Sequence, residues 1–334
     1  MALLFCDSFD HYTTVLQKWT VMDTATISAG NGRNGTASLR FARMEHYARK
    51  TLGVNAQTLV VGIACRVSSI LAGCLAIGFM DAGLWQCEVR INALGQLTIC
   101  RNATVLATSA NSLLINTYYY IEFKVYIHDA AGSAEIKVNG ISWASVAGAD
   151  TKNTVNAYAN QVQIGAGGGV GSASIGDYDD LYVCDNAGVV NNDYLGDVRV
   201  QAILPDGAGG NTEWDPSAGA NWQCVDEVPP NEDVDYVYTS VAGERDSYTF
   251  VNLIPVAGSI NAVVIYPRSR KDDAGARTVA PVVRIGGINY DGIGQAIGNS
   301  YAYYPQIYET SPATIAAWTI AEINGAEFGV KLVA

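Results

Sequence analysis

The chain has 334 residues, of which 49% are hydrophobic and 16% are charged, so it can bury one large core or two medium ones and lacks the composition of a disordered protein. Its formal net charge of −12 argues against a nucleic-acid partner, whose phosphates require a basic surface, and against adhesion to anionic membranes. We therefore expect no nucleic-acid partner and no membrane insertion.

The N-terminal segment MALLFCDSFDHY has no basic region, and Asp7 interrupts its apolar run. It does not predict a signal peptide, and no other stretch is long and apolar enough to span a bilayer. The seven cysteines are scattered without C-x-x-C spacing, at positions 6, 65, 74, 87, 100, 184 and 224. Free thiols in a protein made in a reducing cytosol are the simplest interpretation, and these cysteines predict no metal site.

Apolar and polar residues alternate with a period of two along most of the chain, which is the pattern of half-buried β-strands. The first apolar rows, in chain order, are Leu59, Val61, Ile63, Cys65 and Val67, then Leu75, Ile77 and Phe79, then Val89 and Ile91, and then Leu97 and Ile99. Sustained helical periodicity is nearly absent. Short strands at this spacing, separated by glycine-rich turns, predict a sandwich or a barrel.

The stretch YYYIEFKVYIHDAAGSAEIKVNG, residues 118–140, predicts two strands joined by a polar turn. We expect one apolar row of its first strand to face the core, namely Ile121, Phe123, Val125 and Ile127. Glu122 alternates with this row, so it is expected on the solvent side, where its replacement costs little. Asn139-Gly140 predicts a tight hairpin turn, because both residues tolerate positive φ.

The organisation predicted is all-β, with two β-sandwich domains of jelly-roll type and very little helix. We place the boundary in the polar, turn-rich segment 185–193, which gives domains of residues 1–190 and 191–334. Strands continue through the second half, and the last one carries Phe328, Val330 and Leu332. One short helical turn is expected where Thr319 and Glu322 have the spacing of a capping box.

No constellation of residues predicts catalysis. Glycoside cleavage requires two carboxylates at a defined separation, and the E-x-D-x-x-E strand pattern that supplies them in retaining β-glucanases is missing. The densest acidic cluster, Val225–Tyr236, contains two prolines and predicts a loop. His11, His46 and His128 lie near no nucleophile motif, and the glycine loop at 165–169 lacks the lysine of a phosphate-binding loop.

We therefore expect no enzyme, no catalytic residue and no cofactor. A glycan-degrading enzyme with an unusual pair of carboxylates is the alternative.

Three carboxylates lie close together in GDYDDLYV, at Asp177, Asp179 and Asp180. Such a group could hold calcium at the rim of a lectin-like sandwich. Strict alternation places Asp177 and Asp179 on one face of the strand and Asp180 on the other, so only part of the trio converges on one ion. The alternative is a set of structural carboxylates that fix turns or pair with arginine, and no metal-binding residue is assigned.

Tyrosine is used heavily, with 19 residues. Exposed tyrosines stack on sugar rings and anchor protein interfaces, whereas in an antiparallel sheet tyrosine is also a good strand former. The sequence leaves core packing, protein contact and glycan contact open as their roles.

Several of these segments resemble concanavalin A-like jelly-roll proteins encoded by tailed bacteriophages and prophages. The resemblance is carried by LLFCDSFDHY, by the hairpin YIEFKVYIHDAAGSAEIKVNG and by the strand DYDDLYVCD. It continues through LGDVRVQAILPDGAGGNTEWDPS, DDAGARTVAPVVRIGGINYDG and YAYYPQIYETSPATIAAWTIAEINGAEFGVKLVA, and so covers nearly the whole chain. It transfers no catalytic or binding residue to these positions.

The resemblance implies a non-enzymatic virion structural protein in the tail, the baseplate or a fibre, with a lectin-like domain that contacts host surface glycans. A capsid decoration or head-fibre protein of the same fold is the alternative. Its partners would be other virion proteins and further copies of itself in a homo-oligomer. It would be made in the host cytoplasm and end in the virion, which agrees with free thiols and with an N-terminus that does not read as a signal peptide.

Overall fold

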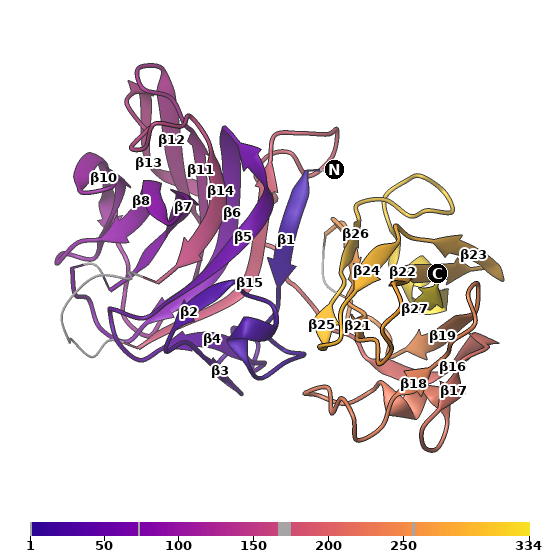
Figure 1. The fold of residues 1–334 in the computed structure, drawn as a ribbon. Helices are drawn as coiled ribbons and strands as arrows, with labels where there is room; N and C mark the ends of the chain where they lie inside the picture. The colour runs from indigo at the N-terminus through magenta and orange to yellow at the C-terminus, as the bar shows by residue number, and fades with distance from the viewer. Residues whose placement is uncertain (1, 73, 166–174, 256–257) are drawn as a thin grey trace. The chain divides into compact units, whose positions relative to one another are not determined.

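The structure is a computed structural model that describes residues 2–72, 74–165, 175–255 and 258–334. The chain forms two compact units, Met1–Val200 and Gln201–Ala334 (Figure 1). Strands dominate both units, and the one α-helix among the described residues is α1 (Ile320–Gly325). The all-β prediction is therefore confirmed.

The first unit is a jelly-roll sandwich of two antiparallel sheets. The eight-stranded sheet runs in the order β13 (Ile141–Ala149), β12 (Gly132–Val138), β11 (Tyr119–Tyr126), β6 (Thr58–Val67), β15 (Gly176–Asp185), β4 (Ser38–Phe41) and β3 (Thr26–Ser28), with β1 (Leu3–Asp7) paired to β15. The seven-stranded sheet runs in the order β10 (Thr104–Ser112), β9 (Gln96–Arg101), β8 (Leu84–Ile91), β7 (Ala76–Asp81), β14 (Ala159–Ile164), β5 (Tyr47–Ala56) and β2 (Val21–Asp23). A 3₁₀ turn, η1 (Val15–Gln17), follows β1.

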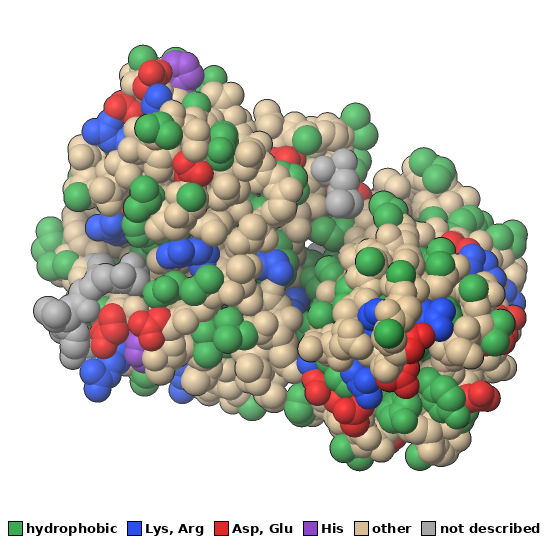
Figure 2. Space-filling view, viewed as in Figure 1, with side chains coloured by type: hydrophobic (Ala, Val, Ile, Leu, Met, Phe, Trp, Pro, Cys, Tyr) green, Lys and Arg blue, Asp and Glu red, His purple; other side chains and the backbone are tan. Residues whose placement is uncertain are grey.

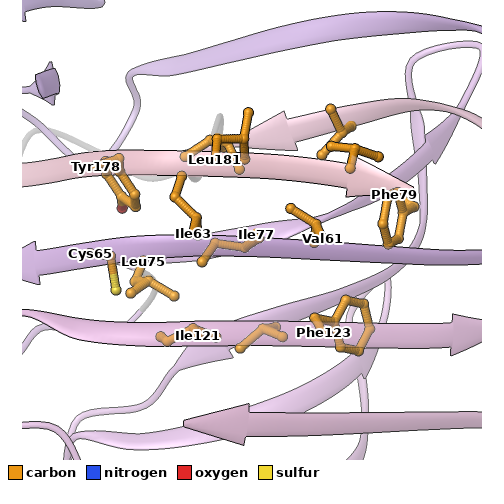
Figure 3. Close-up of a cluster of buried hydrophobic side chains, with 14 of the residues drawn as sticks. Val61, Ile63, Cys65, Leu75, Ile77, Phe79, Ile121, Phe123, Tyr178 and Leu181 are labelled. Atoms are coloured by element: carbon orange, nitrogen blue, oxygen red, sulfur yellow. The ribbon is translucent and has the colours of Figure 1, made fainter. Parts of the chain in front are cut away.

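The core of the first unit lies between these two sheets, because each strand turns every second side chain inward. The inward row of β6 is the predicted one: Leu59, Val61, Ile63, Cys65 and Val67. Figure 3 shows part of this cluster, in which Ile77 and Phe79 come from the seven-stranded sheet and Tyr178 and Leu181 come from β15.

The stretch 118–140 forms β11 and β12, as predicted. The predicted apolar row has no exposed surface: Ile121, Phe123 and Val125 belong to β11, and Ile127 follows its end. The ring of Phe123 stacks on that of Phe79 in the opposite sheet, with centroids 6.2 Å apart. Asn139 and Gly140 have φ of 50° and 79°, which confirms the turn that leads into β13.

Residues 191–200 lie in the first unit, although the sequence places them with the second domain. Lys124 of β11 forms an ion pair with Asp193, with 2.8 Å between Nζ and Oδ1. The backbone N–H of Leu195 donates to the hydroxyl of Tyr182 on β15. These contacts attach a polar stretch, which reads as a linker, to the outer face of the eight-stranded sheet.

The second unit is built around a six-stranded sheet with three two-stranded ladders. The large sheet runs β16 (Pro205–Thr212), β19 (Arg245–Phe250), β27 (Glu327–Leu332), β22 (Arg277–Ile285) and β23 (Ile288–Asp291), with β24 (Gln295–Ile297) also paired to β22. The ladders are β17 (Asp215–Pro216) with β18 (Val237–Tyr238), β20 (Val263–Ile265) with β26 (Gln306–Tyr308), and β21 (Arg268–Ser269) with β25 (Ala302–Tyr303). A 3₁₀ turn, η2 (Asn221–Cys224), follows β17.

The short helix α1 begins where the capping pattern predicts. The Thr319 side chain accepts a 3.1 Å hydrogen bond from the backbone N–H of Glu322. Ile323 of the helix is buried in a small cluster with Trp318 and Phe328. The last strand, β27, also confirms its predicted apolar row, since Phe328, Val330 and Leu332 are all buried.

The surface of the described structure carries both acidic and basic side chains (Figure 2). In the part of the chain that the structure describes, no helix is long and apolar enough to cross a membrane. On the face shown in Figure 2, Lys and Arg side chains lie among Asp and Glu side chains.

Phe123→Ala should lower the free energy of unfolding by about 3–5 kcal/mol, because it leaves a cavity against Phe79 in a fully buried core. Urea titration of the purified protein measures this loss. Leu94→Ala is the matched control: Leu94 is 74% exposed at a turn, so its loss should stay within about 0.5 kcal/mol. Equal losses for the two variants would show that the inward face of β11 is misassigned.

Candidate functional site

The outer face of the eight-stranded sheet carries buried polar side chains. Glu122 of β11 and Tyr182 of β15 are each 1% exposed. The Tyr182 hydroxyl donates a 2.5 Å hydrogen bond to Oε1 of Glu122. Burial is the largest cause that raises the pKa of Tyr182, followed by the neighbouring Tyr120 and Glu122. The hydroxyl therefore stays protonated and acts as the hydrogen-bond donor.

A glycine on the strand between them makes this contact possible. Gly62 of β6 is the cross-strand partner of both Glu122 and Tyr182. A Cβ at this position would lie 2.0 Å from Cε1 of the Tyr182 ring, well inside van der Waals contact. The ring therefore occupies the space that a larger residue would fill, and from there it reaches Glu122.

The segment that follows β15 closes over this pair. The backbone N–H of Leu195 donates to the Tyr182 hydroxyl at 3.0 Å, and that of Gly196 donates to Oε1 of Glu122 at 2.8 Å. Gly196 has φ of +80°, a left-handed conformation that favours glycine. The buried carboxylate thus obtains its hydrogen bonds and holds the segment against the sheet.

The expectation that Glu122 is exposed to solvent is wrong, since its side chain is 1% exposed, and the expectation that its replacement costs little loses its basis. Alternation does place Glu122 on the outer face of the sheet, as the pattern indicates. That face is covered by residues that come about 70 positions later in the chain, as the separation of Glu122 and Gly196 shows. The strand pattern reports which face a side chain occupies, but not whether something covers that face.

Asp180 also departs from the predicted alternation. The register between β15 and β6 shifts between Asp179 and Tyr182, and Asp180 has φ of +52°. A bulge of this kind inserts one extra residue and changes the face of the side chains that follow. Asp180 therefore lies on the outer side, where its Oδ1 accepts a 2.7 Å hydrogen bond from the backbone N–H of Val200. Leu181 enters the core in its place.

Asp177, the first of the three carboxylates, is held by two arginines. Nε and Nη2 of Arg40 donate to its two oxygens at 2.7 and 3.0 Å, and Nη2 of Arg66 donates at 2.7 Å. The hydroxyl of Ser38 adds a further hydrogen bond. This is the arginine pairing that the sequence leaves open as the alternative to calcium.

The carboxylates of Asp179 and Asp180 are held by backbone N–H groups, including that of Asp180 itself, and by Arg33. Oδ2 of Asp179 accepts the backbone N–H of Arg33 at 2.8 Å, and Nη2 of Arg33 lies 3.0 Å from Oδ2 of Asp180. Burial, followed by the charge of Asp180, raises the pKa of Asp179 to about 7. Within the described residues, no three His, Cys, Asp or Glu side chains are grouped to hold a metal. The structural role accounts for this trio, and calcium gains no support.

A pocket lies beside the covered pair, between strands β11 to β13 and the segment that crosses them. Its volume is about 530 Å³. The charged and aromatic lining consists of Lys124, Glu135, Lys137, Asp193 and Tyr194, and Ser133 and Ser145 add hydroxyls. We call it the Tyr194 pocket.

Most of the charged groups in the Tyr194 pocket are bound to one another. Nζ of Lys124 lies 2.8 Å from Oδ1 of Asp193, and the Tyr194 hydroxyl donates to Oε2 of Glu135 at 3.1 Å. Nζ of Lys137 lies over the Tyr194 ring, 3.7 Å from its centroid, in a cation–π contact. The tyrosine ring is thereby held between a carboxylate at its hydroxyl end and an ammonium on its face.

These contacts set the charge state of the pocket. Partial burial alone would raise the pKa of Asp193, but the hydrogen bonds from Lys124 and from the Tyr194 backbone outweigh it and the pKa is lowered. Burial and the nearby Glu135 raise the pKa of Tyr194. At neutral pH, Asp193 is therefore an anion and Tyr194 is a neutral hydrogen-bond donor.

Sequence reasoning did not find this pocket. Asp193 and Tyr194 lie at the end of the stretch that reads as a linker and just beyond it, and the hairpin 118–140 contains no motif. The one usable signal is alternation, which places Lys124, Glu135 and Lys137 together on the outer face of β11 and β12. No local sequence pattern predicts which later segment covers that face.

Three other regions were of interest in the sequence. Most of the glycine loop 165–169 lies outside the described residues. The acidic stretch 225–236 runs as a loop, as predicted, up to β18, and its Glu232 pairs with Arg268. His128 accepts two backbone N–H groups of the turn that follows it, so it fastens the hairpin.

One carboxylate on the outer face of the seven-stranded sheet is fully buried. Glu88 of β8 has no exposed surface, and burial raises its pKa to about 8. Nη2 of Arg90 lies 2.7 Å from its Oε1. After burial, Arg90 has the largest effect on this pKa and acts to lower it. Glu88 thus faces a cation across the strand surface.

No protein-family model matches this sequence, and no curated protein is similar to it. Solved structures of a lyase, an esterase and a lectin align with part of this chain. Alginate lyase Aly36B is 16% identical, with a TM-score of 0.36, over 48% of this chain and 82% of the lyase. A carbohydrate esterase of Shiga toxin-encoding bacteriophage phi24B is 12% identical, with a TM-score of 0.38, over 54% of this chain and 99% of the esterase.

Lectin II from Ulex europaeus is 11% identical, with a TM-score of 0.35, over 49% of this chain and 91% of the lectin. At TM-scores of 0.35 to 0.38, these likenesses establish neither a family nor an activity.

Glu122→Ala should lower the free energy of unfolding by about 1–3 kcal/mol, because it leaves the Tyr182 hydroxyl and the Gly196 N–H buried without their acceptor. Urea titration measures the loss, and hydrogen exchange should show reduced protection of the Gly196 amide. Asp23→Ala, at an exposed carboxylate on β2, is the control and should change stability by less than about 0.5 kcal/mol. A loss no larger than that of the control would contradict the buried role of Glu122.

The stability of the first unit should fall as the pH rises from about 4.5 to about 8, in part through Glu88. Its folded pKa of about 8 lies above its ordinary value of 4.5, so the folded state holds this proton more tightly than the unfolded state does. The contribution is complete below pH 4.5 and is lost as the pH rises through 8. Calorimetry across this range should show a smaller fall in melting temperature for Glu88→Gln than for the native chain, and parallel curves would contradict this origin.

Proposed function

We propose that the chain is a non-enzymatic structural protein of a bacteriophage particle, in the tail, the baseplate or a fibre, and that it binds host surface glycans in the Tyr194 pocket. The virion role is supported by the resemblance of the sequence. The glycan role is carried by one observation: a pocket of about 530 Å³ combines a tyrosine with hydroxyl, carboxylate and ammonium groups.

The chemistry of the pocket suits a polyhydroxyl ligand. Sugar hydroxyls both donate and accept hydrogen bonds, so a sugar site needs acceptors such as Glu135 and Asp193 and donors such as Lys137. The volume falls within the range of about 300–1,000 Å³ that small-ligand sites occupy. The side chains of β11, β12 and β13 stand on a rigid sheet, which limits the loss of conformational entropy on binding.

Binding without cleavage is supported by the charge state of the pocket. The acid that protonates a glycosidic oxygen needs a raised pKa in order to hold its proton at neutral pH. The pKa of Asp193 is instead lowered, in part by Lys124. Asp193 is therefore suited to accept hydrogen bonds from hydroxyls and not to donate a proton.

The buried thiols fit synthesis in the reducing host cytoplasm. Cys65, Cys87, Cys184 and Cys224, among others, are buried free thiols in strands or turns. In the assembled virion the partners would be other virion proteins and further copies of this chain in a homo-oligomer. Several copies in one particle would convert weak single-site contacts into avid attachment.

A glycan array probed with the full chain tests the binding role. We expect retention on a subset of glycans and no release of reducing ends from them. Tyr194→Ala should abolish retention, whereas Tyr238→Ala, at a tyrosine that is 51% exposed in the second unit, should not change it. Release of reducing ends would contradict the non-enzymatic role, and unchanged retention by Tyr194→Ala would contradict the assignment of the pocket.

Immunogold labelling of intact particles tests the virion role separately. Labels on the tail, the baseplate or fibres are the expected result. Labels on the head would instead favour the capsid decoration or head-fibre alternative, and particles without label would contradict the virion role.

A further inference from the structure

Lys137 differs from the other charged residues of the Tyr194 pocket. Lys124 has Asp193 as its counter-ion, and Glu135 accepts the hydroxyl of Tyr194. The ammonium of Lys137 contacts the ring of Tyr194, 3.7 Å from its centroid, and forms no ion pair or hydrogen bond with any residue that the structure describes. It is the one cation of this pocket without a direct ion pair there, although its charge, after that of Lys124, also helps to lower the pKa of Asp193.

The position of this ammonium is restricted. The ring beneath it is fastened at its hydroxyl by Glu135 on the same strand, and Lys137 is itself only partly exposed on β12. An ammonium has three donors and no acceptor, and one of its sides is already covered by the ring. Its remaining donors are therefore available to a ligand in the pocket.

We propose that the glycan selected by the Tyr194 pocket carries an anionic group, a carboxylate or a sulfate, and that Lys137 binds this group. This inference rests on the proposed glycan-binding function. Hydrogen bonds between two charged groups are roughly twice as strong as neutral ones, so an anionic sugar gains more from Lys137 than a sugar hydroxyl does.

The carboxylates of the pocket do not oppose this arrangement. The charge of Asp193 is balanced by Lys124, with which it is in direct contact. Glu135 has one oxygen bound to Tyr194 and would accept sugar hydroxyls with the other. The anionic group is therefore placed at Lys137 and the hydroxyls of the same sugar at Glu135 and Asp193.

The test uses the full chain on an array of uronate-containing, sialylated and sulfated oligosaccharides, each printed beside its carboxyl-reduced or desulfated counterpart. Binding to acidic glycans that is lost in the reduced or desulfated partner supports the inference, and the two arms distinguish carboxylate from sulfate. Equal binding to acidic and neutralised partners overturns the inference but leaves the glycan-binding function standing. Binding to no glycan contradicts that function and the inference with it.

A variant pair assigns the effect to Lys137. Lys137→Met keeps the aliphatic stem and removes the charge, and it should weaken binding of the acidic glycan by about tenfold or more, as expected for the loss of a charge-assisted contact. Binding of the neutralised partner should change by less than about twofold. Lys152→Met, outside the pocket, is the control that should change neither affinity. Equal weakening of both glycans by Lys137→Met would overturn the inference.

Discussion

A single buried carboxylate, that of Glu122, determines which segment of the chain covers the outer face of the eight-stranded sheet beside it. A carboxylate removed from water must find hydrogen-bond donors, or the fold loses several kcal/mol. Here the donors are the hydroxyl of Tyr182 and the backbone N–H of Gly196. Because one donor belongs to a later segment of the chain, satisfying Glu122 requires residues 193–200 to lie against the sheet. The Tyr194 pocket is a consequence of that requirement.

The pocket combines two kinds of support. Three of its charged side chains, on β11 and β12, have positions set by the pleat of the sheet. Asp193 and Tyr194 are held by Lys124 and Glu135 of the sheet and by the hydrogen bonds of the residues that follow them, Leu195 and Gly196. Further along, Asp180 at the bulge of β15 binds the backbone of Val200. The crossing segment is thus fastened by Glu122 near its middle and by Asp180 at its end, and neither fastening uses the residues that line the pocket.

The fold was predictable because it depends on local patterns, and the site was not because it depends on distant contacts. Alternation identified the inward rows of β6 and β11, and positive φ at Asn139 and Gly140 follows from their chemistry. Predicting the burial of Glu122 would have required knowing which segment covers the sheet. Predicting the outward position of Asp180 would have required knowing where the bulge falls. Tyr194 was hidden for the same reason: a polar, turn-rich stretch has the composition of a linker whether or not it packs.

Strongly raised carboxyl pKa values often indicate functional sites, but in this protein they indicate the cost of burial. Glu88 and Asp179 have raised pKa values because their surroundings remove water, and each contacts an arginine or backbone N–H groups of its own unit. Asp193 has a lowered pKa because Lys124 stabilises its charge within reach of solvent. A site that binds a ligand through permanent charges needs a carboxylate whose charge is stabilised, as in Asp193, and not one whose pKa is raised by burial. The direction of the shift alone does not mark such a site, because the pKa of the buried Asp7, paired with Lys18, is lowered as well.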